Sequence, residues 1–503
     1  MLVPAPRRTA GVADTLAPFL WGEGGVRGLL RVALAACPPV SWLVQLARSV
    51  GAACPPVSWL IPLAIGLTVA LTAPVAPAAE FRAASAKADI TPPDSFDLWG
   101  YSDRSGPSTG THDPLFAKVL LLGVPPHRLA IVTLDLGRTF GVDSMESVRK
   151  RVQASAGVEQ VFFFASHTHS APFINDKYPD GKRPAWEERA LDRIAAAIEQ
   201  AAGRLEPATL GVGEGEVLIG HNRRYVRPDG TVKMLWRNAT KTPTHPVDPR
   251  VGILRVDGRN GKTLAVVVNY ACHPVVFGPD NLKYSADYPS AMAAVVESAF
   301  GEGTVCLFLQ GAAGDINPYF DKTPLAEDAD KLMQETGREL GREALRVARA
   351  IVPKPPDKPE LAFALDLRHF RPRYDADKLI ASLKGQVKPE VIERYRGYLT
   401  NPLDCPVTTL VINRQIALVG MPGEPFVEFG QAFRDRSPAA FSLFAGYANG
   451  YHGYFPTIRA AVEGGYGAEG LVSRAEVGAG ETMLDTGLIR LYTLLGQLNP
   501  QPK

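Results

Sequence analysis

The chain has 503 residues, of which 46% are hydrophobic and 21% are charged. A chain of this size and composition can bury a substantial core, so we expect a globular protein with one large or two ordinary domains. The 54 basic and 52 acidic residues give a formal net charge of +2. No basic run of the kind that follows a phosphate backbone is present, so nucleic acid is excluded as an expected partner.

Residues 1–79 differ in composition from the rest of the chain. No charged residue stands between Arg48 and Glu80, and Trp59–Leu71 is an almost unbroken apolar run. A basic flank, an apolar segment and the small residues after it predict a secretory signal, cleaved just before Glu80. The alternative is an uncleaved membrane anchor, because the uncharged stretch is long enough to span a bilayer. In both cases the remaining chain is predicted to be exported, either to the periplasm or the medium or as an anchored protein.

The same region contains a direct repeat, since residues 36–43 recur as residues 53–60. Two of the five cysteines lie in this repeat, which leaves Cys272, Cys306 and Cys405. An odd number of cysteines is not a disulfide framework, although one bridge is possible.

Beyond Glu80, short β-rich runs alternate with amphipathic helical stretches, which is typical of a layered α/β domain. Helices are expected over residues 186–203 and 325–350. Strands are expected over residues 119–123, 129–134, 161–164, 251–256, 264–269 and 305–309. The fold class predicted for residues 80–503 is a mixed β-sheet core with flanking helices and a metal site at strand ends.

A proline-rich segment at 353–359 must end the second helix and marks the clearest internal break. Further elements are expected after it: a strand over 361–367, a polar helical insertion over 375–399, a buried strand over 410–419, and helices over 425–434 and 486–498.

The strongest local signal is the segment SHTHSAP at 166–172, which follows the expected strand at 161–164. His167 and His169 alternate, so in an extended segment both imidazoles leave the strand end on the same side. One neutral imidazole there can bind zinc, and the second can hold a proton or an oxyanion. The alternative is a pair of surface or capping histidines.

His273 also follows an expected strand, in the segment VVNYACHP at 267–274. Alone it is more typical of a partly buried histidine than of a ligand, but α/β proteins assemble sites at strand ends. The glycine-rich segment QGAAGDINP at 310–318 follows a third expected strand. Its glycines can bring backbone N–H groups close to a negative charge, or form a plain turn. Asp315 can orient a metal-bound histidine.

Two later segments add oxygen-bearing side chains. Glu424, in MPGEPF, is either an oxygen ligand or a carboxylate favoured at the start of the helix expected over 425–434. Tyr451 and Tyr454, in GYANGYHGY, are either a phenolate ligand and a substrate contact or ordinary half-buried tyrosines.

In this order the segments resemble the neutral/alkaline non-lysosomal ceramidase family. Its catalytic domain carries His-Thr-His-Ser-Gly-Pro, a later strand-end His, Gly-Asp-Val-Ser-Pro, Pro-Gly-Glu-Phe and Asn-x-Tyr-x-x-Tyr motifs. The similarity runs from about Ala84 to about Gly467 and includes Lys87–Pro93 and Asn222–Arg224. Five motifs in order are far more specific than any one of them.

The resemblance implies an N-acyl amide hydrolase with a lipid or other small-molecule substrate, possible association with a membrane surface, and one catalytic zinc. His169 and Arg223 would stabilise the oxyanion of a tetrahedral intermediate, and zinc would activate water and polarise the amide carbonyl. Nitrogen and oxygen ligands without thiolate are compatible with zinc. The implied zinc ligands are His167, His273, Glu424 and Tyr451.

Three departures from the family pattern bear on the chemistry. Asn317 stands where the family has its active-site serine, and an amide cannot serve as a hydroxyl nucleophile. Either water attacks directly, with the Asn317 amide positioning the substrate, or amidase activity is lost. Ala171 replaces a motif glycine, which is a mild change. The chain ends at Lys503, so we expect no C-terminal β-sandwich domain.

Two other functions fit the same residues. A zinc and an arginine also serve hydrolysis of carboxylic, phosphate or sulfate esters. A non-catalytic zinc-containing protein that binds lipid or carbohydrate would account for the loss of the serine.

Overall fold

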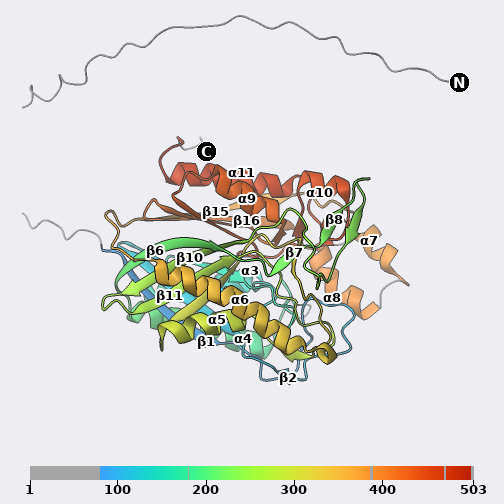
Figure 1. The fold of residues 1–503 in the computed structure, drawn as a ribbon, viewed down its shortest axis with the longest axis horizontal. Coiled ribbons are helices and arrows are strands. Elements are labelled where there is room, and N and C mark those ends of the chain that lie inside the picture. The colour runs from blue at the N-terminus through green and yellow to red at the C-terminus, as the bar shows by residue number, and fades with distance from the viewer. Residues whose placement is uncertain (1–79, 179–180, 386–388, 470–471, 500–503) are drawn as a thin grey trace, which may run out of the picture. The chain divides into compact units, whose positions relative to one another are not determined.

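The computed structural model describes residues 80–499, except 179–180, 386–388 and 470–471. The expected signal or anchor, residues 1–79 with their repeat, lies outside the described residues. Within the described ranges, no helix combines the length and apolar character that a membrane crossing requires. Figure 1 shows the elements coloured along the chain.

An eight-stranded mixed sheet forms the centre of the fold. Its pairs are antiparallel except at the two edges, where β5 runs parallel to β4 and β13 runs parallel to β11. In order across the sheet, the strands are β13 (Val305–Gln310), β11 (Thr263–Tyr270), β10 (Arg250–Gly258), β6 (Glu206–Glu216), β1 (Arg82–Asp89), β3 (Phe116–Val124), β4 (His127–Leu134) and β5 (Gln160–Ala165).

The twist of this sheet decides where its edge strands end. In the strand order, β5 and β13 point in opposite directions. Adjacent strands are rotated by about 20–25°, so seven steps add up to about 140–175°. The sheet also curls, because β13 lies against β3, β4 and β5, and the carboxyl ends of the two edge strands meet.

Four helices cover one face of the large sheet: α3 (Val142–Ala156), α4 (Ala185–Gly203), α5 (Tyr288–Phe300) and α6 (Ala329–Ala350). Side chains alternate between the faces, so Val119 and Leu121 pack under helices while Leu120 and Leu122 point the other way. On β6, Gly211 lets the end of α6 approach, because a Cβ there would lie 2.4 Å from the Ile351 side chain.

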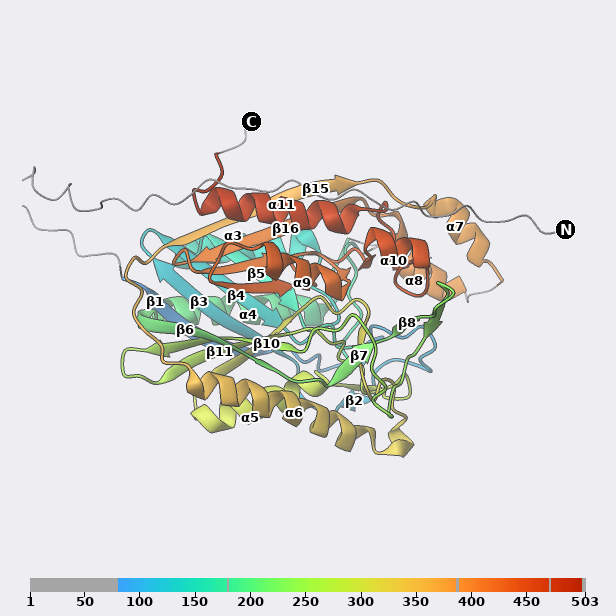
Figure 2. The same ribbon diagram turned by 45° about the horizontal axis from the view of Figure 1, so that its top comes forward.

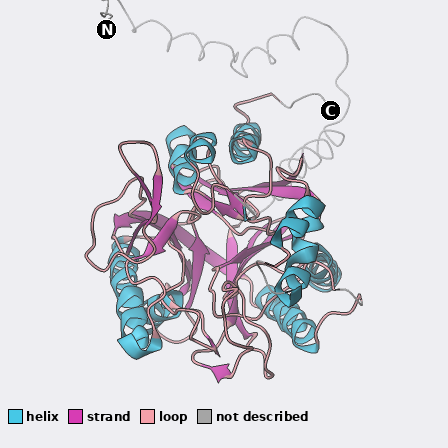
Figure 3. Cartoon of the chain, turned by 90° about the vertical axis from the view of Figure 1, so that its right-hand side faces the viewer, coloured by secondary structure: helices cyan, strands magenta, loops and turns pink. Residues whose placement is uncertain are grey.

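A second sheet packs on the other face. Its strands are β15 (Leu361–Phe370), β16 (Leu403–Ile412), β17 (Ile416–Gly420) and β19 (Phe441–Ala445), in that order, with β17 parallel to β19. Leu410, Leu418 and Leu443 face the large sheet in a shared core. Helices α9 (Val427–Arg436) and α11 (Ala479–Leu494) cover the outer face. The strands of both sheets thus lie inside, with α3 and α4 outside one half of the large sheet, α5 and α6 outside the other half, and α9 and α11 outside the second sheet (Figures 2 and 3).

Short elements complete the fold and surround the site described below. They are the strand pairs β2 (Gly110–Thr111) with β12 (Lys283–Tyr284), β7 (Gly220–Asn222) with β14 (Ile316–Pro318), β8 (Arg224–Val226) with β9 (Val232–Met234), and β18 (Glu424–Pro425) with β20 (Tyr454–Phe455), and the helices η2 (Leu325–Glu327), α7 (Ala376–Leu383), α8 (Pro389–Thr400) and α10 (Ile458–Glu463).

The predicted fold class, a layered mixed sheet with flanking helices, is confirmed. The six strands expected before residue 310 and the helix at 186–203 are observed with boundaries shifted by a few residues. The sequence reasoning did not assign strands β1 and β6 or helices α3 and α5, because small and polar residues interrupt their apolar periodicity.

Several expectations are wrong in detail. The single strand expected over 410–419 is a hairpin of β16 and β17, turned at Asn413 and Arg414, whose φ angles are 53° and 57°. The helix expected over 325–350 is interrupted at Asp328, and the last helix covers 479–494 instead of 486–498. The possible disulfide is also absent from the described residues, since Cys272, Cys306 and Cys405 are buried free thiols.

We expect the core between the two sheets to control stability. Leu418 is 3% exposed there, so Leu418→Ala removes a buried side chain and should lower the free energy of unfolding by about 2–5 kcal/mol. Leu367, on the same sheet, is 54% exposed, and Leu367→Ala should change it by about 0.5 kcal/mol or less. Urea unfolding of both variants is the measurement, and equal losses would contradict the assignment of this core.

Candidate functional site

Five chain segments meet where strands of both sheets end. They follow β5, β11 and β13 in the large sheet and β17 and β19 in the covering sheet. Gln310, at the end of β13, connects two of them: its Nε2 donates to the Ser166 carbonyl at 3.0 Å and to the Cys272 carbonyl at 2.8 Å. Each carbonyl belongs to the residue immediately before a histidine. Gln310 therefore fixes the spacing between His167 and His273.

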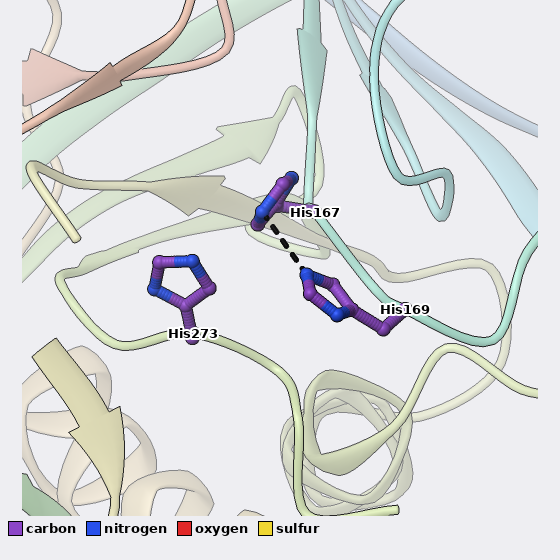
Figure 4. Close-up of side chains that lie close together, drawn as sticks. All are labelled: His167, His169 and His273. Carbon is purple, nitrogen blue, oxygen red and sulfur yellow. Dashed lines mark hydrogen bonds between the residues drawn. The ribbon is translucent and has the colours of Figure 1, made fainter. Parts of the chain in front are cut away.

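Three imidazoles converge at this point (Figure 4). Nδ1 of His167 donates to the Gly137 carbonyl at 2.6 Å, and Nδ1 of His273 donates to the Ala313 carbonyl at 2.6 Å. These backbone bonds fix the tautomer, so the Nε2 lone pairs face the centre of the site. Nε2 of His169 lies 3.3 Å from Nε2 of His167. One ring nitrogen from each of the three histidines lies within 4.8 Å of the others.

Glu424, in the short strand β18 that follows β17 of the covering sheet, completes the group. Its Oε2 lies 3.0 Å from Nε2 of His273 and 3.3 Å from Nε2 of His167. Its Oε1 accepts a hydrogen bond from the Tyr451 hydroxyl at 2.5 Å. Burial opposes the negative charge of Glu424, but the nearby His167 and His273 outweigh burial and hold the pKa of this carboxyl well below its usual range.

The imidazoles of His169 and His273 are held in the neutral form. Burial lowers the pKa of His273 to about 4. Burial, followed by repulsion from His167 and His273, holds the pKa of His169 well below its usual value. A neutral imidazole keeps a free lone pair at neutral pH, which metal coordination needs.

The donor set fits a zinc ion. Neutral imidazole nitrogens, one carboxylate and no thiolate are ligands that zinc accepts, and the ring nitrogens are aimed by hydrogen bonds from their far sides. His167, His273, Glu424 and Tyr451, the four ligands implied by the resemblance, lie together here. His169, expected as an oxyanion group, is close enough to be a further ligand.

The suggested role of Asp315 in orienting a histidine is wrong. Its Oδ1 accepts a hydrogen bond from the Val427 N–H at 2.9 Å, and its Oδ2 accepts one from Asn222 at 2.6 Å. Backbone carbonyls hold the histidines instead. Because Val427 is the first residue of α9, Asp315 performs the helix-start role that was considered for Glu424.

Arg223 is a buried cation beside the group formed by His167, His169, His273 and Glu424, which is the candidate metal-binding group. Its Nη1 donates to Oδ1 of Asn317 at 2.9 Å and its Nη2 donates to the Gly314 carbonyl at 2.7 Å. Tyr454 contacts it through its ring, as do two aromatic residues that sequence reasoning missed. The guanidinium carbon lies 5.2–5.4 Å from the ring centroids of Trp236, Tyr454 and Tyr466. Three rings and two acceptors thus hold one positive charge in place.

Other residues of the site were also missed. Tyr447 is fully buried and stacks on the His167 ring, with centroids 4.3 Å apart. Tyr447 belongs to the segment GYANGYHGY at 446–454. Its backbone is left-handed, with φ 54°, which the sequence does not reveal. Gln310 opens the quoted glycine-rich segment, but its long-range bonds have no sequence signature. Asp321 accepts a hydrogen bond from Nδ2 of Asn317 at 2.8 Å and lies beyond the quoted segment.

The sequence and the fold match known proteins. A family model described as neutral/alkaline non-lysosomal ceramidase, N-terminal, matches residues 81–336. The curated neutral ceramidase of Pseudomonas aeruginosa is 25% identical over 280 residues, which are 52% of this chain and 40% of that relative. The match therefore spans less than half of the curated relative's length.

Two solved structures share the fold. A structure of ceramidase complexed with C2 matches with a TM-score of 0.66 and 20% identity, over 84% of this chain and 77% of the other. The crystal structure of neutral ceramidase from Pseudomonas aeruginosa matches with a TM-score of 0.65 and 20% identity, over 84% and 76% of the two chains. At this identity the structural likeness concerns the fold alone.

We expect acid to destabilise the metal-free protein through His273. Its pKa is about 4 in the folded chain and about 6.5 when unfolded, so between these values the unfolded chain binds the proton and the folded chain does not. The free energy of unfolding should therefore fall as the pH falls from about 6.5 towards 4. NMR titration of the chelated protein should place the His273 midpoint near 4. A midpoint near 6.5 would contradict the buried, neutral state.

Proposed function

The chain belongs to the neutral/alkaline non-lysosomal ceramidase family, and from this premise we propose that it is an exported, zinc-dependent hydrolase of N-acyl amide bonds in lipids of the ceramide type. One observation carries the proposal. His167, His273 and Glu424 converge from three strand ends beside the buried Arg223, which combines a metal-binding group with a fixed positive charge. Export is supported by the composition of residues 1–79.

His167, His273, Glu424 and Tyr451 are the proposed ligands. Zinc, when bound, supplies a Lewis acid that polarises a carbonyl and lowers the pKa of water to about 7. The protein's own contribution is the fixed geometry. Backbone carbonyls orient both imidazoles and Gln310 sets their separation, so little rearrangement is needed when the ion binds.

Arg223 and His169 are the proposed stabilisers of negative charge. Attack on an amide carbonyl moves negative charge to the carbonyl oxygen, and prepositioned donors in a site that excludes water stabilise it strongly. Arg223 carries a permanent positive charge at 3% exposure. His169 is neutral, and one of its ring nitrogens can donate a hydrogen bond to the same oxygen.

Asn317 cannot attack the substrate, so a water molecule must supply the attacking oxygen. The expected role of Asn317 in positioning the substrate is less direct than the sequence suggested, because Arg223 and Asp321 hold the two ends of its amide. We propose that Asn317 positions Arg223. Tyr454 contributes one wall of the substrate site, since its ring lies against Arg223 and its backbone pairs with Glu424.

Removal of the metal should abolish activity. The full chain should contain one zinc and hydrolyse a short-chain fluorescent ceramide, and chelation should stop hydrolysis until zinc is restored. His167→Ala should lower the rate by about 100-fold or more, because losing a ligand exceeds the 10–100-fold effect of losing a ligand's partner. His369→Ala, with a side chain 71% exposed on β15, is the matched control and should leave the rate unchanged.

The outcomes separate the candidate functions. Bound zinc with no cleavage of amides would contradict the amidase proposal, and panels of carboxylic, phosphate and sulfate esters would then test the other hydrolases. Full activity in a zinc-free protein would overturn the metal centre.

Arg223→Lys should lower kcat by about 100–1000-fold with a much smaller effect on KM. Lysine keeps the positive charge but cannot reproduce the two-armed contact with Asn317 and Gly314. Arg346→Lys is the control, because Arg346 has a side chain 64% exposed on α6. Steady-state kinetics together with thermal unfolding would distinguish lost chemistry from lost stability, and an unchanged kcat would remove Arg223 from the mechanism.

A further inference from the structure

Asn317 is held from both ends. Its Oδ1 accepts a hydrogen bond from Arg223 at 2.9 Å, and its Nδ2 donates one to Oδ2 of Asp321 at 2.8 Å. Asp321 follows four residues later, on a turn closed by the hydrogen bond from its N–H to the Pro318 carbonyl. The position that carries a serine in the family is therefore part of an Arg223–Asn317–Asp321 chain of hydrogen bonds.

Asp321 has an acceptor that the described protein does not use. The residue is 1% exposed, and its Oδ1 accepts no hydrogen bond from any described residue. A buried carboxylate oxygen without a donor is costly, so the unused oxygen of Asp321, one hydrogen bond away from Asn317 beside Arg223, calls for an explanation. Burial raises the pKa of Asp321 to about 6, against the opposing charge of Lys322, so the carboxylate is negatively charged at neutral pH.

The neighbours of Asp321 connect it to the metal-binding group. The Lys322 ammonium lies 4.1 Å from the Trp236 ring centroid and 5.8 Å from that of Tyr101. The Tyr101 ring meets the His169 ring edge to face, with centroids 4.8 Å apart. The Trp236 ring also faces Arg223. The turn that carries Asp321 thus lies between the residues that contact His169 and those that contact Arg223.

We propose that Asp321 is a substrate-binding residue, whose Oδ1 accepts a hydrogen bond from a hydroxyl group close to the scissile amide. A carboxylate oxygen pairs only with donors, so the subsite selects a hydroxylated substrate and rejects an analogue that lacks the hydroxyl. The inference rests on the proposed amidase function and adds the polar group that the substrate must carry. Asn317 fixes the carboxylate through Oδ2, so the second oxygen is aimed in one direction.

The test compares substrates that differ in one hydroxyl. The full chain would be given a fluorescent N-acyl amino alcohol, its deoxy analogue, and a third substrate with the hydroxyl on the acyl chain. We expect kcat/KM to fall about 10–100-fold for the deoxy analogue, because Asp321 is then left unpaired. Asp321→Ala should reduce this ratio to about 1, and Asp321→Asn should give an intermediate value. The third substrate shows whether Asp321 binds a hydroxyl on the amino-alcohol side or on the acyl side of the amide.

The ratio of kcat/KM for the hydroxylated substrate to kcat/KM for the deoxy analogue distinguishes substrate recognition from folding. A merely structural defect lowers kcat/KM for both substrates equally. Asp485→Ala, with a side chain 54% exposed on α11, is the control and should keep the wild-type ratio. A ratio that is unchanged in Asp321→Ala would overturn the inference while leaving the amidase proposal intact.

A binding measurement covers the case in which no amide is cleaved. Calorimetry with 2-amino-1,3-propanediol on the zinc-loaded full chain should show binding that Asp321→Ala abolishes at unchanged zinc content. Binding that depends on Asp321 without hydrolysis would support the subsite and contradict the amidase function. No binding and no hydrolysis would overturn both.

Discussion

The carboxylate of Glu424 is buried, and most of the site consists of the groups that surround it. Isolated in the interior, Glu424 would be expensive to ionise, and its two oxygens face the Tyr451 hydroxyl, which donates to one of them, and the rings of His167 and His273. These partners come from three different strand ends. The five segments that form the site must therefore meet at one point, and the layered fold supplies the means.

Twist and long-range hydrogen bonds bring the segments together. The large sheet twists and curls, so the end of β13 lies beside the end of β5. Gln310 then connects the chain before His167 to the chain before His273. The segments that follow the parallel strands β17 and β19 of the covering sheet add Glu424 and Tyr451. The group of histidines and Glu424 is thus a product of both sheets, and the core between them supports its geometry.

The replacement of the family serine by Asn317 removes a hydroxyl group but leaves a hydrogen-bonded side chain at this position. The amide is engaged by Arg223 on one side and by Asp321 on the other, so the position has become structural. Positive charge for an oxyanion and an unused acceptor for a hydroxyl remain on either side of it. A change that in sequence resembles a lost nucleophile is, in three dimensions, a chain of hydrogen bonds from Arg223 through Asn317 to Asp321, beside histidines that could hold a metal.

The sequence by itself determined the layered class, most strands of the large sheet and the positions of His167, His273 and Glu424, because apolar periodicity and strand-end motifs are local properties. It did not determine the turn at Asn413 that splits one apolar run into two strands, or the helix-start role of Asp315. Nor could it reveal Gln310, Tyr447, Trp236 and Asp321 as parts of the site. Gln310 contacts a carbonyl 144 residues away and Tyr447 stacks on His167 from a left-handed backbone, while Trp236 and Asp321 contact nearby residues that no motif marks. Only the packed tertiary structure decides such contacts.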